Sequence, residues 1–383
     1  MNGRYSEPLA SYGSVHYVRQ CEEEVLLLDN IAHPNIPISE LPHFRKQRKG
    51  YYGAIYGIIR RPDKHSSSID LLTDNQVKAL IDAAVSRNDA VGITHNPGIS
   101  WMPVTAWKIA PDAVAKKCNL HEPYLMTYIA SRSTSIHIPR VRRVLPMHKK
   151  ESLSGRYSIW LVMDFIDGNE LETAWPQMSW WNRLWTIWKL RKSIRELHQI
   201  PVPRPNVPGP FDSTGKALAC SGYYFSETGT GPFESYSAMA DWFDHLRYSL
   251  LVDLHMNYRS FKPHLYPMFD ISHPLVLCYM DLNMRNIIVD KRGDVWLVDW
   301  GMDGAFPPWF EYANMVLFAR AAIKERRLPK SWVFFAPFVA GNYQWYEAEY
   351  LRCLEYDFER SWLDHPKGYF ERLRLDITYR WSC

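Results

Sequence analysis

The stretch at residues 278–301, CYMDLNMRNIIVDKRGDVWLVDWG, decides the fold predicted for this protein. Within it, two short apolar runs at 287–289 and 295–298 flank the sequence KRGD at 291–294. Apolar runs of this length, separated by charged residues and a glycine, are typical of a β-hairpin and its turn. The stretch therefore predicts a polar loop, a strand, a tight turn and a second strand, in that order.

Polar side chains lie at both open ends of the predicted hairpin. Asp281 and Asn286 precede its first strand, and Asp299 follows its second strand. Kinases use this spacing: one Asp faces the hydroxyl that receives the phosphoryl group, while the Asn and the second Asp hold magnesium. Asp and Asn also commonly cap turns. Because several spaced features agree, we expect Asp281 to be catalytic and Asn286 and Asp299 to be metal ligands.

The same residues resemble the aminoglycoside-phosphotransferase (choline-kinase-like) group of small-molecule kinases, in its fungal branch. That group carries H-x-D-L-N-x-R-N-I-I-V and then D-W-G, and this chain has YMDLNMRNIIV at 279–289 and DWG at 299–301. Tyr279 replaces the family's His, which usually orients the loop, so the change bears on rate more than on reaction type. PPWFEY at 307–312 resembles the family's P-P-x-x-E-Y element, expected beneath the metal loop. The resemblance covers about 73–320.

A lysine and a glutamate in the first half of the chain are expected to complete this site. Lys108 lies in the apolar sequence VTAWKI, where a buried ammonium group needs a partner. A lysine at a strand edge can instead extend its charge into solvent. Glu122 begins a predicted helix; it can hold Lys108 against the nucleotide phosphates, although a glutamate is also favourable at any helix N-terminus. We favour the Lys108–Glu122 pair as part of the nucleotide site.

The apolar strand SIWLVMDFI at 158–166 leads, in a kinase-like fold, into the connector between two lobes. Exposed backbone groups on such a connector can donate to and accept from adenine. Asp164 and Ile166 are therefore further candidates for nucleotide binding, through their backbone and not their side chains.

Other segments predict the helices around the site. A capping box at 73–76 predicts a helix that follows it. Tryptophans recur in helical register along 181–197; core packing is favoured for them over a substrate-binding role. A proline-rich, glycine-containing segment near 201–235 resembles an insertion of the fungal branch and precedes a helix that begins near Tyr236. Two closing helices are expected at 313–326 and 345–363.

Composition excludes several other classes of protein. The chain has 383 residues, with 45 Lys and Arg against 41 Asp and Glu and a net charge of +4, so no nucleic-acid partner is expected. Its 6 cysteines lack C-x-x-C spacing, which argues against a structural zinc site or a disulfide scaffold. No apolar run approaches the length of a membrane span. We expect a soluble, cytoplasmic monomer or homodimer without a membrane partner.

These features together predict a two-lobed, protein-kinase-like α+β fold. It would comprise an N-terminal extension at 1–72, a sheet-rich lobe at 73–163 and a mainly helical lobe at 164–383. The resemblance implies ATP and Mg²⁺ as cofactors and transfer of the γ-phosphoryl group to a hydroxyl of a small molecule. A catalytically weak or inactive scaffold is the alternative, favoured by Tyr279 and a glycine-poor turn at 95–98. A protein kinase ranks last, because the span after Asp299 is too short for an activation segment.

Overall fold

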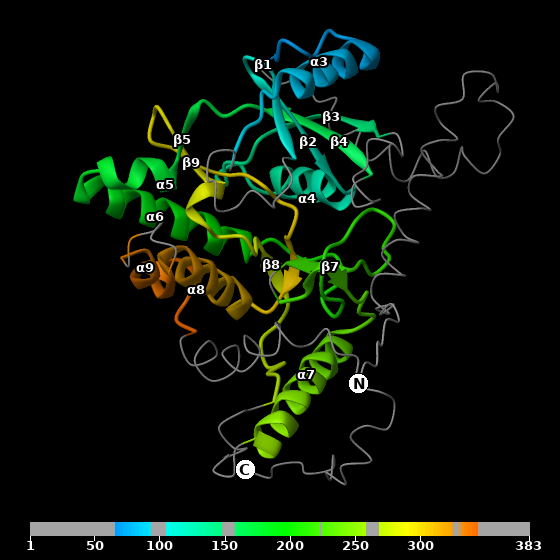
Figure 1. Ribbon diagram of the computed structural model, residues 1–383, viewed down its shortest axis with the longest axis vertical. Helices are drawn as coiled ribbons and strands as arrows, with labels where there is room; N and C mark the ends of the chain where they lie inside the picture. The colour runs from blue at the N-terminus through cyan, green and yellow to red at the C-terminus, as the bar shows by residue number, and fades with distance from the viewer. Residues whose placement is uncertain are drawn as a thin grey trace, which may run out of the picture.

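The protein folds into two lobes (Figure 1). The computed structural model describes residues 66–92, 105–147, 158–222, 224–257, 268–324, 329 and 331–343. One lobe, at the top of Figure 1, is built on a four-stranded sheet, and the other is mainly helical. The predicted two-lobed, protein-kinase-like α+β fold is confirmed. The boundaries predicted for the lobes remain a prediction.

The smaller lobe is an antiparallel sheet with one helix on each face. Its strands lie in the order β1-β2-β4-β3 and comprise β1 (Ala106–Ala110), β2 (Ala113–Cys118), β3 (Val141–Pro146) and β4 (Ile159–Asp164). Alternate residues of β2 face opposite sides. Ala113 and Ala115 pack in the apolar cluster of α3 (Asp74–Arg87), whereas Val114 and Cys118 pack in that of α4 (His121–Ala130).

Local sequence explains both helices of this lobe. The Thr73 side chain accepts a hydrogen bond from Gln76 N, and the Gln76 side-chain oxygen accepts one from Thr73 N, which confirms the capping box. Asn88 ends the helix in the left-handed conformation that a short polar residue tolerates. Ile69, in the last part of the predicted N-terminal extension, is fully buried with Val77 of α3. The end of this extension therefore packs on the small lobe.

The larger lobe holds most of the helices. They are α5 (Leu171–Ala174), α6 (Trp180–Leu197), α7 (Tyr236–Asn257), α8 (Trp309–Lys324) and α9 (Ser331–Ala340), with short 3-10 turns η4 (Trp175–Gln177) and η6 (Met284–Asn286). The helix predicted to begin near Tyr236 is confirmed as α7. The segment between α6 and α7 forms the ribbon β6 (Cys220–Gly222) and β7 (Ser226–Thr230), which lies against the larger lobe (Figure 1).

The predicted hairpin is present and lies between the lobes. Its strands are β9 (Ile287–Asp290) and β10 (Val295–Leu297), and Gly293 supplies a positive φ of 79° at the turn. β9 also pairs with β5 (Gly168–Glu170), which directly follows the connector from β4. A second pair joins β8 (Val276–Cys278) to β11 (Gly304–Phe306). These pairings fix the loops that precede β9 and follow β10.

The prediction that the α6 tryptophans pack in the core is wrong. Trp181, Trp185 and Trp188 are 78%, 55% and 46% exposed. The buried face of α6 is instead its aliphatic stripe, which includes Ile187 and Leu190. The helix carries two apolar stripes, and periodicity alone does not say which of them meets the rest of the lobe.

Some expectations concern residues outside the described ranges. They are residues 1–65 of the predicted N-terminal extension, the turn at 95–98 and the helix at 345–363. No helix within the described part of the chain is long and apolar enough to cross a membrane.

Candidate active site

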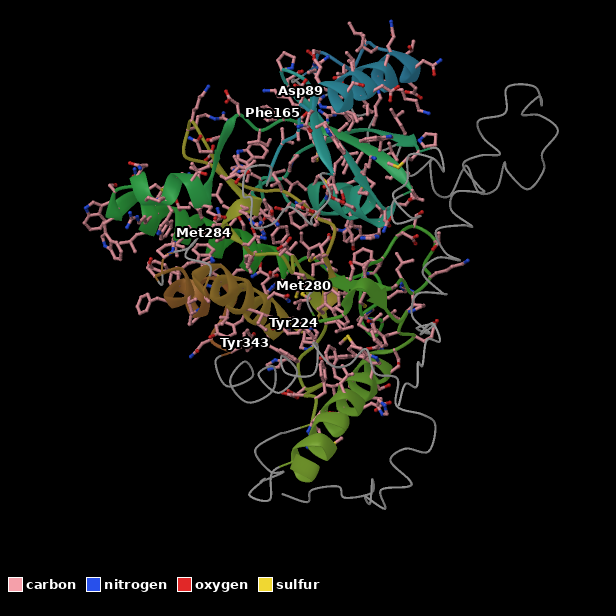
Figure 2. The ribbon with its side chains drawn as sticks, in the orientation of Figure 1. Asp89, Phe165, Tyr224, Met280, Met284 and Tyr343 are labelled. Carbon is pink, nitrogen blue, oxygen red and sulfur yellow. The ribbon has the colours of Figure 1, made fainter. Side chains whose placement is uncertain are left out.

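Asp281 lies in the loop between β8 and η6, between the two lobes. Met280, which lies in this loop, and Met284, which begins η6, are labelled in Figure 2. The Asp281 side chain receives hydrogen bonds from Asn283 Nδ2 at 2.5 Å and Asn286 Nδ2 at 2.6 Å. Asn283 also accepts from the backbone N–H groups of residues 285 and 286, so it caps η6. The two amides therefore fix both the loop and the orientation of the Asp281 carboxylate.

The backbone just before Asp281 is held from below by Glu311 of α8. This glutamate is fully buried and accepts from Tyr279 N at 2.7 Å and Met280 N at 3.1 Å. Met280 has a φ of 63°, an unfavourable conformation for a residue with a side chain. The two charge-assisted bonds stabilise that conformation. The PPWFEY element thus packs beneath the loop, as its resemblance to the family implied.

Asp299 follows β10 and faces the small lobe. It too has a positive φ, of 65°, and its side chain is 48% exposed. Its Oδ1 atom accepts a hydrogen bond from Lys116 Nζ at 2.7 Å. The turn at Asp299 therefore directs an accessible carboxylate toward the underside of the four-stranded sheet.

Glu122 pairs with Lys116, so the prediction that it pairs with Lys108 is wrong. Lys116 Nζ lies 2.5 Å from Glu122 Oε1, and both side chains are almost fully buried. Lys108 is on β1, where its Nζ lies 3.6 Å from the ring centroid of Phe165 in the connector. β1 is one of the two edge strands, whereas β2 lies inside the sheet and carries Lys116 over α4. The lysine that the structure brings into this candidate site is therefore Lys116, which was not predicted from the sequence.

One sequence signal was available for Lys116. It belongs to the run AVAKKC, in which alternation places two adjacent lysines on opposite faces of a strand. Lys117 does lie on the other face, near the rings of Trp107 and Trp160. Of the two, Lys116 shares a face with α4 and hence with Glu122.

The environment of the site shifts the pKa values of Asp281 and Asp299 in opposite directions. Burial and the nearby charge of Asp299 raise the pKa of Asp281 to about 7. Partial burial opposes ionisation of Asp299, but the ion pair with Lys116 outweighs it and lowers the pKa of Asp299. Burial on its own would lower the pKa of Lys116. The charges of Asp299 and Glu122 outweigh burial, so the pKa of Lys116 is raised. At neutral pH the site thus holds a charged Lys116–Asp299 pair beside a carboxyl group able to exchange a proton.

The connector residues predicted to contact adenine lie at the end of β4. Asp164 accepts from Arg142 Nε at 2.5 Å, so its side chain is already engaged. Ile166 follows two residues later, ahead of β5. The N–H groups of Asp164 and Phe165 donate to the backbone oxygens of Arg140 and Asp112, so recognition of a base would fall to the backbone oxygen of Asp164 and the backbone of Ile166.

Tyr279, which stands in place of the family's His, is buried and contacts Val298 and Trp300 on either side of Asp299. Its hydroxyl donates a hydrogen bond to the backbone oxygen of Val298, and its ring packs edge-on against Trp300 at 4.7 Å between centroids. The side chain is completely buried. Tyr279 therefore joins the Asp281 loop to the Asp299 loop and makes no part of the accessible surface of the site.

The donor atoms at the predicted metal ligands suit Mg²⁺. The amide nitrogen of Asn286 is bonded to Asp281, which leaves its carbonyl oxygen as the atom available to a cation. Asp299 contributes an ionised, half-exposed carboxylate. Magnesium prefers oxygen ligands and usually takes only one or two carboxylates from a protein alongside phosphate oxygens. Asn286 and Asp299 would therefore hold Mg²⁺.

This fold and site define the class of two-lobed, kinase-like phosphotransferases. The chain belongs to the phosphotransferase enzyme family, whose profile matches residues 108–356. No curated protein matches the sequence.

Solved structures similar to this one include several aminoglycoside phosphotransferases. APH(4)-Ia is 12% identical with a TM-score of 0.42, and the match covers 77% of this chain and 94% of that one. A thermostable mutant of that protein in ternary complex with ADP and hygromycin B is 15% identical, with a TM-score of 0.41 and 77% and 92% covered. The gentamicin complex of APH(2'')-IIa is 13% identical, with a TM-score of 0.40 and 79% and 93% covered.

Proposed function

We propose that this protein transfers the γ-phosphoryl group of ATP to a hydroxyl group of a small molecule. The observation that carries the proposal is the convergence of Lys116 and Glu122 from one lobe with Asp299 from the other, beside Asp281. Membership of the phosphotransferase enzyme family supports the same reaction type. The predicted lobes at 73–163 and 164–383 would then meet at the nucleotide.

Nucleotide binding is assigned to residues of both lobes. Lys116, held by Glu122, would place its ammonium group against the phosphate oxygens. The backbone of Asp164 and Ile166 would contact the adenine. Asn286 and Asp299 would hold Mg²⁺, which supplies charge neutralisation at the phosphates when bound.

Asp281 would act on the acceptor. Its carboxylate orients the hydroxyl and takes the proton as the new O–P bond forms and the bond from the γ-phosphorus to the leaving oxygen of ADP breaks. The carboxyl is held by two amides and has a pKa of about 7, so it can both accept and release a proton near neutral pH.

The proposal is tested by ADP release from ATP in the presence of a panel of hydroxylated metabolites, with and without magnesium. Turnover should require both an acceptor and Mg²⁺. Asp281→Asn keeps the size of the side chain and removes its basicity, so phosphoryl transfer should fall by roughly 10²–10⁴-fold. Affinity for ATP with Mg²⁺ should stay nearly unchanged.

Two results would contradict the assignment in different ways. Binding of ATP without turnover on any acceptor would indicate a nucleotide-binding scaffold. If Asp281→Asn weakened ATP binding and left turnover per bound ATP intact, Asp281 would belong to the metal site instead. Arg204→Gln, on an exposed loop of the larger lobe, is a matched control that should change neither quantity.

A further inference from the structure

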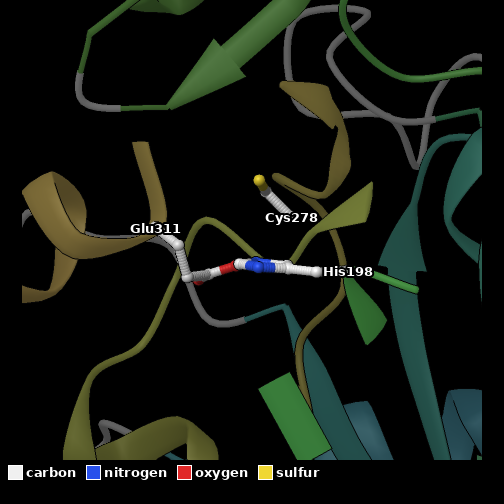
Figure 3. Close-up of side chains that lie close together, drawn as sticks. All are labelled: His198, Cys278 and Glu311. Carbon is white, nitrogen blue, oxygen red and sulfur yellow. The ribbon is translucent and has the colours of Figure 1, made fainter. Parts of the chain in front are cut away.

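A second group of ligand atoms lies behind the loop of Asp281. His198 follows the last turn of α6, Cys278 ends β8, and Glu311 is in the first turn of α8 (Figure 3). One atom from each, a histidine nitrogen, the cysteine sulfur and a carboxylate oxygen, lie within 4.8 Å of one another. His198 Nε2 and Glu311 Oε2 are 3.6 Å apart. Three elements far apart in sequence therefore converge on one small space.

The polar atoms of this cluster do not satisfy one another's hydrogen-bonding capacity. His198 Nε2 is buried and has no hydrogen-bond partner in the structure described, since 3.6 Å to Glu311 is too long for a hydrogen bond. Cys278 and Glu311 are almost completely buried. An unpartnered buried nitrogen facing a buried carboxylate is costly, and a bound cation would satisfy both.

We propose that His198, Cys278 and Glu311 bind a zinc ion. A nitrogen, a thiolate and a carboxylate are the ligand types that Zn²⁺ takes, and three protein ligands leave the fourth tetrahedral position for water. Zinc–ligand bonds of about 2.0–2.3 Å in a tetrahedron separate ligand atoms by roughly 3.3–3.8 Å. The 3.6 Å between His198 and Glu311 already fits that spacing. Magnesium, which avoids sulfur and nitrogen, would not compete here.

The existing contacts of Glu311 and Cys278 are compatible with this ion. Glu311 accepts the N–H groups of Tyr279 and Met280, but each carboxylate oxygen has two lone pairs, and metal-bound carboxylates are commonly hydrogen-bonded as well. The Cys278 thiol points to the backbone oxygens of Phe306 and Pro307 at 3.6 and 3.7 Å. Binding breaks the S–H bond, forms a Zn–S bond and releases one proton to solvent.

The cluster lies where a bound ion would affect the backbone that precedes Asp281. Glu311 holds the backbone of Met280 immediately before Asp281, so an ion fixed to Glu311 would stiffen the catalytic loop from behind. The cluster is separate from Asn286 and Asp299. The absence of C-x-x-C spacing in the sequence does not conflict with it, because only one cysteine takes part.

Cobalt substitution tests the site directly. The full-length protein is stripped with a chelator and titrated with Co²⁺; thiolate ligation should give a near-ultraviolet charge-transfer band, with visible bands of tetrahedral intensity, saturating at one ion per chain. Zn²⁺ should abolish the bands and excess Mg²⁺ should not. Cys278→Ser should lose the charge-transfer band, whereas Cys220→Ser, which changes another fully buried cysteine, should keep it.

A second variant guards against a folding defect in Cys278→Ser. His198→Gln alters a side chain that is 18% exposed, and it should weaken zinc binding by more than about 10-fold, the loss seen even for residues that only support a ligand. Lack of a charge-transfer band in the wild type would overturn the proposal, as would a band that survives Cys278→Ser. These spectra require no turnover, so their outcome is independent of the proposed kinase activity.

Discussion

Lys116 Nζ donates a hydrogen bond to Asp299 Oδ1 over 2.7 Å, although 183 residues separate the two in sequence. Lys116 belongs to the sheet of the small lobe, and Asp299 ends the hairpin of the larger one. Glu122 pairs with the same lysine at 2.5 Å and also accepts a hydrogen bond from Trp300 N at 3.2 Å. This ion pair joins the lobes across the place where the proposed reaction occurs.

Replacing Lys116 should abolish nucleotide binding, whereas replacing Lys108 should not. ATP with Mg²⁺ should raise the melting temperature of the wild type and of Lys108→Met, because a ligand selective for the folded state stabilises it. The shift should disappear in Lys116→Met. Lys116→Met alone also leaves Glu122 buried without its partner, at a cost of about 3–5 kcal/mol.

The double variant Lys116→Met, Glu122→Gln separates these two effects. It should recover much of the stability and still fail to bind ATP in isothermal titration. Normal binding by a folded Lys116 variant, or its loss in Lys108→Met, would reverse the assignment of the two lysines.

Activity should rise with pH through about 7, because Asp281 accepts a proton only as the carboxylate and its pKa is raised to about 7. The positive charge of Arg285 lowers the pKa of Asp281, so Arg285→Gln should move the acidic limb of kcat/KM to higher pH. Lys291→Gln, on the exposed hairpin turn, is the control and should leave the profile in place. A limb that moves to lower pH in Arg285→Gln would refute this account of the base.

Tyr279→His should retain phosphoryl transfer and should not change the acceptor. Tyr279 is buried and bonded to the backbone of Val298, so it supports the loop and does not touch the acceptor. Steady-state kinetics on one acceptor, with melting curves of both proteins, measure the effect. Complete loss of activity in a stably folded variant would show that the tyrosine has a role of its own.

Asp303→Asn should stabilise the protein, increasingly so as the pH rises. Both carboxylate oxygens of Asp303 are buried and receive no hydrogen bond from another residue that the structure describes. Burial and the charge of Glu122 raise the pKa of Asp303 well above its ordinary value. The folded state therefore keeps a proton that the unfolded state loses above about pH 4, so wild-type stability falls as pH rises.

Asparagine removes this dependence. The gain in unfolding free energy should grow between pH 5 and pH 8 by about 1.4 kcal/mol per pH unit, for as long as Asp303 keeps its proton in the folded state. Denaturant unfolding at the two pH values gives the comparison. An equal gain at both would mean that Asp303 does not hold a proton in the folded state.

The amino-acid sequence alone determined the hairpin and the residues at its ends. Strand, turn and strand are set by neighbours within a few positions, so local patterning was enough to place Asp281, Asn286 and Asp299 around β9 and β10. The capping box of α3 and the start of α7 were readable for the same reason.

Contacts between distant segments were decided only by the tertiary structure. Lys108 and Lys116 both lie on strands among apolar residues. The strand order makes β1 an edge strand and puts β2 inside the sheet, where Lys116 meets Glu122. Likewise, the tryptophans of α6 have the periodicity of a core face, yet the aliphatic face of that helix is the buried one. Periodicity specifies which residues share a face, and only the packing of the other elements specifies what that face meets.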